Sequence, residues 1–248
     1  MIQLAAKALL GPMLLVQAWH LRRTALELPE PHGERVGVVG TGHTALRILV
    51  AGDSSAAGVG ARTQDEALAI PLARNISQRL GAAVGWQLVA ESGRTSATLL
   101  DLLRESKLER ADMAVVVVGV NDVTREVKMR DALRSRSAIA DLLRERAGVR
   151  HIAFAALPQM EVLPAVPNPL AWYIGQSSRR NNRAQALWAR TQDGCAHVEM
   201  EGVIDPQQFS EDGFHPAPAL YARVAERLAE HLVERLDVTD QTKIKERE

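Results

Sequence analysis

The stretch Arg47-Ile-Leu-Val-Ala-Gly-Asp-Ser54-Ser55 decides how the rest of the chain is understood. It begins as a short aliphatic run, which is typical of a strand buried inside a parallel sheet. The run stops abruptly at Gly52-Asp53-Ser54, which is small and polar. Open α/β sheets bind ligands at the carboxyl ends of their strands, so this triplet marks a candidate functional site.

The composition indicates one large globular domain and gives no sign of a nucleic-acid partner. The chain has 248 residues, of which 46% are hydrophobic and 24% charged, so a substantial core can be buried. Lys+Arg and Asp+Glu number 30 each, so the charge balance gives no reason to expect nucleic acid as a partner. The single cysteine, Cys195, excludes an intramolecular disulfide and a cysteine-based zinc site.

Expected strands alternate with expected helices. The strands are Leu46–Ala51, Trp86–Ala90, Met113–Val118, Arg150–Ala155 and Ala196–Met200. The helices are Asp65–Leu80, Ser96–Leu108, Met129–Ala147, Ser178–Gln192 and Pro216–Leu236. This alternation predicts a three-layer α/β/α domain of flavodoxin-like type over residues 46–236, with a parallel sheet of about five strands.

The segments outside this domain are less regular. Residues 1–27 form an apolar N-terminal segment, in which residues 2–21 are strongly apolar and Arg22-Arg23 follows them. Gly11-Pro12 leaves the uninterrupted apolar run too short for a secure membrane span. A helix that is packed on the domain or lies at a membrane surface, and a signal or anchor, are both compatible with this pattern. We therefore favour a cytoplasmic or membrane-associated protein, with secretion as the alternative. We expect residues 28–45 to form a connector with short extended segments, and residues 237–248 to form a charged tail.

The segment Gly40-x-Gly42-x-x-Ala45 has the residue spacing of a dinucleotide-binding fingerprint. That fingerprint must open a helix inside a βαβ unit. Here the strand from Leu46 follows at once, so we interpret the glycines as a turn between two extended segments.

Four polar clusters fall at predicted boundaries of strands or helices. They are Asp53-Ser54, Gly93, Gly119-x-Asn121-Asp122 and Asp212-x-x-His215. The carboxyl ends of parallel strands lie along one edge of a sheet, so the first three clusters are expected to converge in one crevice.

In order and spacing, the four clusters resemble the motif blocks of the SGNH (GDSL-type) hydrolase family. The match spans about 170 residues, from Arg47 to His215. It departs from the usual pattern at Ser55, where leucine is common, and this leaves the polar residues of the blocks in place. The resemblance implies the flavodoxin-like fold and a serine esterase or lipase.

The chemistry also follows from the residue types. A serine hydroxyl needs a base to become a nucleophile, so we expect Ser54 to depend on His215. Asp212 can reach the other ring nitrogen and fix the tautomer. The resemblance assigns the oxyanion donors to the backbone N–H groups of Ser54 and Gly93 and to the side-chain amide of Asn121. We expect Asp53 to order the turn by local hydrogen bonds, without taking part in the chemistry.

We expect no functional role for the other arginine and histidine residues considered. Arg134, Arg136, Arg179 and Arg180 are more typical of a solvated face than of an anion site, because the net charge is zero. The remaining histidines have no metal-ligand spacing, and we assign them no role: His20, His32, His43, His151, His197 and His231. We expect neither a metal nor a cofactor.

We therefore expect an ester hydrolase that acts on acyl or lipid-type esters. The segment 157–178 has four prolines and no clear period, so we interpret it as a loop whose Leu163, Trp172 and Tyr173 line the acyl side of the site. Carboxylesterase, lysophospholipase, thioesterase and carbohydrate deacetylase activities all stay open. Outside enzymes, a flavodoxin-like binding module or a membrane-tethered interaction protein are the alternatives. The sequence leaves the oligomeric state open.

Overall fold

The computed structural model describes residues 2–200 and 205–236, with side chains from residue 10 onward. Its strands are β1 (Val36–Val39), β2 (Thr44–Gly52), β3 (Ala83–Ala90), β4 (Met113–Val117), β5 (His151–Ala155) and β6 (Cys195–Val198). Its helices are α1 (Ile2–Thr24), α2 (Ser54–Ala57), α3 (Ala69–Leu80), α4 (Ser96–Glu105), α5 (Val120–Thr124), α6 (Met129–Ala147), α7 (Leu170–Ala189) and α8 (Pro218–Glu234). Short 3-10 turns occupy Met160–Val162 and Pro206–Gln208.

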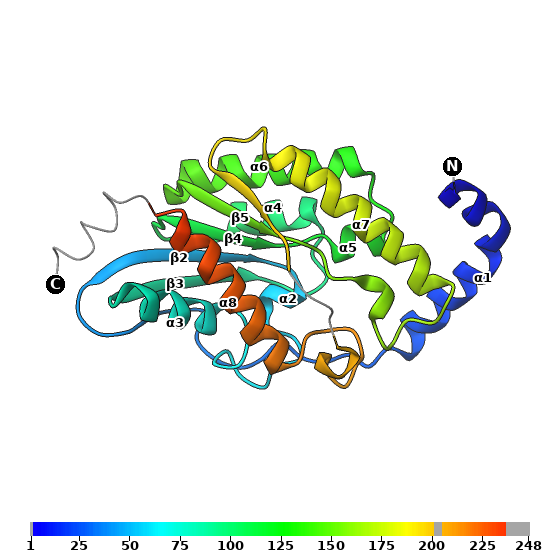
Figure 1. Cartoon of the computed structure of the whole chain (residues 1–248), viewed down its shortest axis with the longest axis horizontal. Helices are drawn as coiled ribbons and strands as arrows, with labels where there is room; N and C mark the ends of the chain where they lie inside the picture. The colour runs from blue at the N-terminus through cyan, green and yellow to red at the C-terminus, as the bar shows by residue number, and fades with distance from the viewer. Residues whose placement is uncertain (1, 201–204, 237–248) are drawn as a thin grey trace.

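The central sheet has the order β1-β3-β2-β4-β5-β6. Strands β3, β2, β4, β5 and β6 run parallel, as the alternation of helices and strands predicted. Helices α3 and α8 cover one face, and α4, α6 and α7 cover the other (Figure 1). The three-layer α/β/α architecture is therefore confirmed, with apolar cores on both sides of the sheet.

Within the described residues the sheet has six strands, one more than expected. The additional strand is β1, which pairs antiparallel with β3 at the edge of the sheet. It has only four residues, Val36–Val39, and they alternate between exposed and half-buried, unlike the buried residues of the inner strands. Residues 40–43 join β1 directly to β2 with no helix between them, so the interpretation of Gly40-x-Gly42 as a turn is confirmed.

The segment 157–178 is not a loop throughout, because α7 begins at Leu170 and not near Ser178. Its prolines concealed this start, yet Pro169 stands immediately before the helix, where proline is tolerated. The buried face also includes polar or small residues such as Gly175, Ser178, Asn181 and Gln185, which hide the hydrophobic period.

Smaller errors concern where two other helices begin. Helix α3 starts at Ala69, not near Asp65, and α8 starts with Pro218 in its first turn, not Pro216. Pro216 instead forms an isolated bridge with Phe209. The N-cap of α4 is Thr95, which forms a reciprocal capping box with Thr98.

The carboxyl end of β2 is held tightly against β4 at Gly52. A Cβ atom on Gly52 would lie 2.1 Å from the carbonyl oxygen of Val117 and 2.6 Å from Cβ of Ala56. Only a residue without a side chain permits this approach. Gly52 therefore sets how closely the strand before Ser54 packs on its neighbour.

We predict that Gly52→Ala lowers the free energy of unfolding by roughly 2–4 kcal/mol, because β2 must move away from β4. Gly42→Ala is the matched control. Gly42 has a positive φ, but a Cβ added there would meet no atom within 4 Å beyond its chain neighbours, so backbone strain alone should cost about 1 kcal/mol. Chemical denaturation of both variants measures the difference. Equal losses in the two variants would contradict this account of Gly52.

Candidate active site

Ser54 lies where β2 passes into α2, at the carboxyl edge of the sheet. It is the first residue of α2, and Asp53 is the N-cap. The backbone N–H of Asp53 donates to the carbonyl of Val117 on β4, over 3.0 Å. The strand end therefore fixes the position of the Ser54 backbone, while its side chain remains partly exposed.

His215 and Asp212 lie on the segment between the Pro206–Gln208 turn and α8. The Asp212 carboxylate organises this segment by accepting hydrogen bonds from the backbone N–H groups of Phe214 and His215, each 2.9 Å, and from the Ser210 hydroxyl at 2.7 Å. The carboxylate is thus held in place by its own loop.

The structure joins Ser54, His215 and Asp212 in one chain of hydrogen bonds. His215 Nδ1 lies 2.5 Å from Asp212 Oδ2, and His215 Nε2 lies 2.7 Å from Ser54 Oγ. A carboxylate can only accept, so Nδ1 carries the proton of the neutral ring. Nε2 is then the acceptor that faces the Ser54 hydroxyl, which is the arrangement needed to take a proton from it.

The two aspartates near Ser54 have opposite electrostatic environments. Burial alone would raise the pKa of Asp212, but the hydrogen bonds from His215, Phe214 and Ser210 outweigh it and hold the pKa well below its ordinary value. Asp53 is 2% exposed, and burial raises its pKa to about 6. Asp212 therefore stays ionised beside His215, whereas Asp53 is far less acidic.

Asp53 orders the turn, as expected from the sequence. Its Oδ1 accepts a hydrogen bond of 3.1 Å from the backbone N–H of Ser55. Among the described residues, its Oδ2 has no hydrogen-bond partner. The contacts of Asp53 are therefore those of a helix cap, and it makes none with His215 of the kind that Asp212 makes.

The two remaining clusters lie on adjacent segments at the same edge of the sheet. Gly93 has a φ of +78°, in the left-handed region that favours glycine. The side-chain Nδ2 of Asn121 donates to the carbonyl of Arg94 over 3.1 Å. An amide nitrogen carries two N–H groups, so within residues 2–200 and 205–236 a second donor of Asn121 remains for a ligand.

The expectation that Arg136 lies on a solvated face is wrong. It is fully buried and pairs with Asp122, the residue after Asn121, at 3.2 Å. Its position falls on the buried stripe of α6 that also contains Ala132, Ile139, Ala140 and Leu143. This helical spacing was the signal that sequence reasoning missed. The neighbouring Arg134 and the pair Arg179-Arg180 are exposed, as expected.

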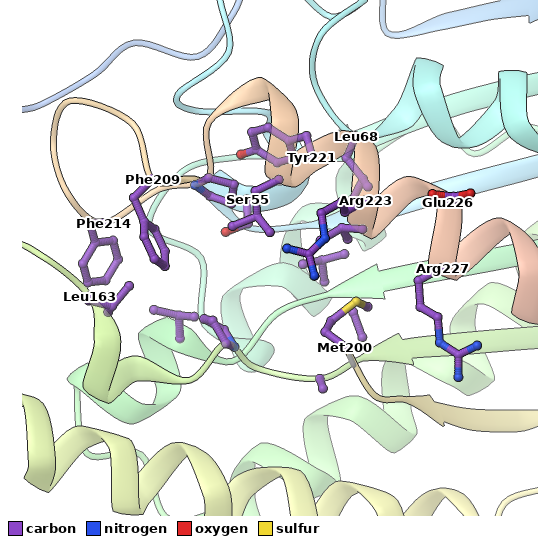
Figure 2. A pocket seen from close by; sticks show the side chains of 18 of the residues that line it. Ser55, Leu68, Leu163, Met200, Phe209, Phe214, Tyr221, Arg223, Glu226 and Arg227 are labelled. Carbon is purple, nitrogen blue, oxygen red and sulfur yellow. The ribbon is translucent and has the colours of Figure 1, made fainter. Parts of the chain in front are cut away.

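A largely apolar pocket of about 390 Å³ opens beside the nucleophile segment. Ser55 and Pro216, the chain neighbours of Ser54 and His215, both line it. Figure 2 shows Leu163, Phe209 and Phe214 grouped at one end and Met200, Arg223 and Arg227 toward the other. Further walls come from Val117, Val120, Leu220 and Val224.

Only one of the three residues expected to line the acyl side borders this pocket. Leu163 is among its lining residues. Trp172 and Tyr173 lie in the first turn of α7 and are not among them. Tyr173 instead donates a hydrogen bond to Glu126 and borders a separate groove. Both side chains belong to α7 because that helix starts earlier than expected, at Leu170.

No group of three His, Cys, Asp or Glu side chains in residues 2–200 and 205–236 could hold a metal ion. Cys195 is partly buried beside Arg144, far along the chain from the Ser54 segment. Burial raises the pKa of its thiol above the ordinary value, so less of the reactive thiolate is present than in a free cysteine.

Comparison with known proteins agrees with this fold. The GDSL-like esterase Rv1075c of Mycobacterium tuberculosis is 25% identical over 206 residues, covering 78% of this chain but 65% of that protein. The lipase Lip_vut3 from a goat rumen metagenome superposes with a TM-score of 0.58 at 18% identity, covering 75% of this chain and 96% of the lipase. Est24, a carbohydrate acetylesterase from Sinorhizobium meliloti, gives 0.56 at 14% identity, covering 76% and 99%.

At these identities the two solved structures establish the shared fold and leave the substrate open. The family model of the GDSL-like lipases and acylhydrolases matches residues 50–223, which is more than half of the chain and includes Ser54, Gly93, Asn121, Asp212 and His215. The chain belongs to the GDSL-like lipase/acylhydrolase family.

Proposed function

We propose that this protein hydrolyses carboxylic esters through an acyl-enzyme on Ser54. The observation that carries the proposal is the continuous hydrogen-bonded chain Ser54–His215–Asp212 at the carboxyl end of β2. A solvated helix-cap serine would not need a histidine at 2.7 Å that is itself oriented by a buried carboxylate. A non-catalytic binding module offers no reason for this arrangement.

The reaction follows from the positions of the protons. His215 Nε2 takes the proton of the Ser54 hydroxyl as Oγ attacks the ester carbonyl, and the ionised Asp212 stabilises the resulting imidazolium. The oxyanion is stabilised by the backbone N–H groups of Ser54 and Gly93 and by the Asn121 amide. His215 then protonates the leaving alcohol. In the second half it activates water, which releases the acid from Ser54.

The favoured substrates are esters with an apolar acyl group. The pocket beside Ser55 is lined largely by aliphatic and aromatic side chains, including Leu163, Phe209 and Val224. The charged lining residues, Arg223, Glu226, Arg227 and Glu230, all come from α8. The apolar remainder of the wall stabilises hydrocarbon by removing it from water. We therefore place the acyl chain in this pocket and retain Leu163, but neither Trp172 nor Tyr173, as a wall residue.

The first prediction concerns the nucleophile. Ser54→Ala should abolish labelling by a fluorophosphonate probe and lower kcat/KM on p-nitrophenyl esters by at least about 10³-fold, because no oxygen remains to be activated. Ser55→Ala is the matched control, since Ser55 is adjacent and lines the pocket; it should still be labelled. Acetylated sugars and lysophospholipids are assayed beside the p-nitrophenyl esters to identify the substrate class. Labelling that persists in Ser54→Ala, or is absent from the wild type, would overturn the proposal.

The second prediction concerns the acyl pocket. Val224→Phe fills part of it and should lower the ratio of kcat/KM for the decanoate ester to that for the acetate ester by at least about tenfold. Trp172→Ala lies outside the pocket lining and should leave this ratio within about twofold of wild type. An unchanged ratio in Val224→Phe would show that acyl chains bind elsewhere.

The N-terminal helix α1 is the proposed contact with a membrane surface. Leu14 packs against the domain in the same apolar cluster as Leu170, and Gln17 bonds to the backbone of Asn168 and Leu170. Figure 1 shows α1 at one end of the molecule, near the start of α7. None of the helices in the described residues is both long and apolar enough to cross a bilayer.

The other side of α1 presents apolar and basic groups together. Leu15 and Val16 are 72% and 64% exposed, and Met13 and Trp19 are also exposed. The guanidinium of Arg23 lies over the Trp19 ring at 4.6 Å. No Asp or Glu precedes Glu27 in the chain. An exposed apolar strip with positive charge and no negative charge fits an anionic lipid surface.

The third prediction tests this contact. The full chain should sediment with vesicles of mixed phosphatidylcholine and phosphatidylglycerol, and Leu15→Ser with Val16→Ser should weaken binding by at least about tenfold. Turnover of soluble acetate ester should not change, because these side chains lie outside the site. Leu187→Ser, which removes an exposed leucine from α7, is the control and should bind as wild type does. Equal binding by the double variant would contradict the assignment.

A further inference from the structure

A fully buried ion pair lies directly behind the segment that carries Asn121. Arg136 and Asp122 are 0% and 1% exposed, with Nη2 of the arginine 3.2 Å from Oδ2 of the aspartate. Ser96 completes the cluster: its backbone N–H and hydroxyl donate to the two Asp122 oxygens over 2.9 and 2.5 Å. We call Ser96, Asp122 and Arg136 the buried clasp.

The clasp connects the two segments that supply proposed oxyanion donors. Ser96 follows Gly93 by three residues and begins α4, whereas Asp122 follows Asn121 directly and belongs to α5. Arg136 holds both, since its Nε donates to Ser96 Oγ over 3.2 Å while its Nη2 contacts Asp122. Movement of either segment would break hydrogen bonds to buried charged groups, which is costly in a medium that excludes water.

The guanidinium itself is fixed by α7 and by the shape of the backbone. Nη1 donates to Gln185 Oε1 over 2.6 Å, and Nη2 also donates to Asn181 Oδ1 over 3.3 Å. Gly119 packs so closely on it that an added Cβ would lie 2.5 Å from Nη2. A side chain at Gly119 would therefore collide with the arginine, and the φ of +137° at this position favours glycine independently.

We propose that the buried clasp is the positioning device of the oxyanion site: it sets the distance between the Gly93 backbone N–H and the Asn121 amide. This role rests on the proposed function of Ser54. The members of the clasp touch no substrate atom, so they are positioning residues. Oxyanion donors act mainly on the transition state, so loosening the clasp lowers kcat and leaves KM nearly unchanged.

The most conservative substitution in the clasp removes one hydroxyl group. Ser96→Ala deletes the oxygen shared by Asp122 and Arg136 but keeps the backbone N–H that bonds Asp122. We expect kcat to fall at least about tenfold, with KM within about twofold of wild type. Affinity for a trifluoromethyl ketone, which forms a tetrahedral adduct on serine, should fall in parallel with kcat.

Two further variants separate positioning from folding. Ser106→Ala removes a hydroxyl that bonds a backbone carbonyl at the other end of α4, and it should lose stability without any loss of kcat. Arg136→Lys keeps the charge but loses the fork that reaches both segments, so it should lower kcat as well. If both act through one cluster, the double variant of Ser96→Ala and Arg136→Lys should be less impaired than the product of the single effects.

The outcomes separate the clasp from the proposed function. If wild type is labelled by fluorophosphonate through Ser54 and folded Ser96→Ala keeps wild-type kcat, the clasp is overturned and the hydrolase proposal stands. A loss confined to KM, or equal losses in Ser96→Ala and Ser106→Ala, would also overturn the clasp. Absence of Ser54-dependent labelling in the wild type would instead remove the proposed function itself.

Discussion

The hydrogen bond between His215 Nε2 and Ser54 Oγ is the contact that the rest of the fold holds in place. Its partners are separated by 161 positions in sequence, so the sheet must bring the two ends of the family domain together. The close packing of Gly52 on β4 fixes one side, and the Asp212-centred loop before α8 fixes the other. The remaining helices bury the two faces of the sheet and so hold this geometry.

Burial and hydrogen bonding divide the acidic residues around this contact. Asp212 is surrounded by donors that hold its pKa low, and it remains an anion that can stabilise an imidazolium. Asp53 is buried, and this burial outweighs the hydrogen bond from the Ser55 N–H, so its pKa is raised to about 6. Asp122 forms a buried ion pair with Arg136. Three carboxylates within one site thus have different tasks because their partners differ.

The sequence was most informative where local chemistry and chain direction agree. Four polar clusters at expected element ends predicted the edge where Ser54, Gly93 and Asn121 gather, and Asp212-x-x-His215 supplied the loop that meets them. It was least informative where tertiary packing decides the outcome. The spacing of Arg136 along α6 indicates a buried position, but its partners from α4, α5 and α7 are set by tertiary packing. The early start of α7 was hidden by polar residues on its buried face, and β1 by its half-exposed edge position.

A crystal structure of the fluorophosphonate adduct tests the central claim most directly, because the phosphonyl group imitates the tetrahedral intermediate. Phosphorus bonded to Ser54 Oγ is expected, with the phosphonyl oxygen within hydrogen-bond distance of the backbone nitrogens of Ser54 and Gly93 and of Asn121 Nδ2. The alkyl chain should point into the pocket beside Ser55. An adduct on another serine, or a phosphonyl oxygen turned away from Gly93 and Asn121, would contradict the account.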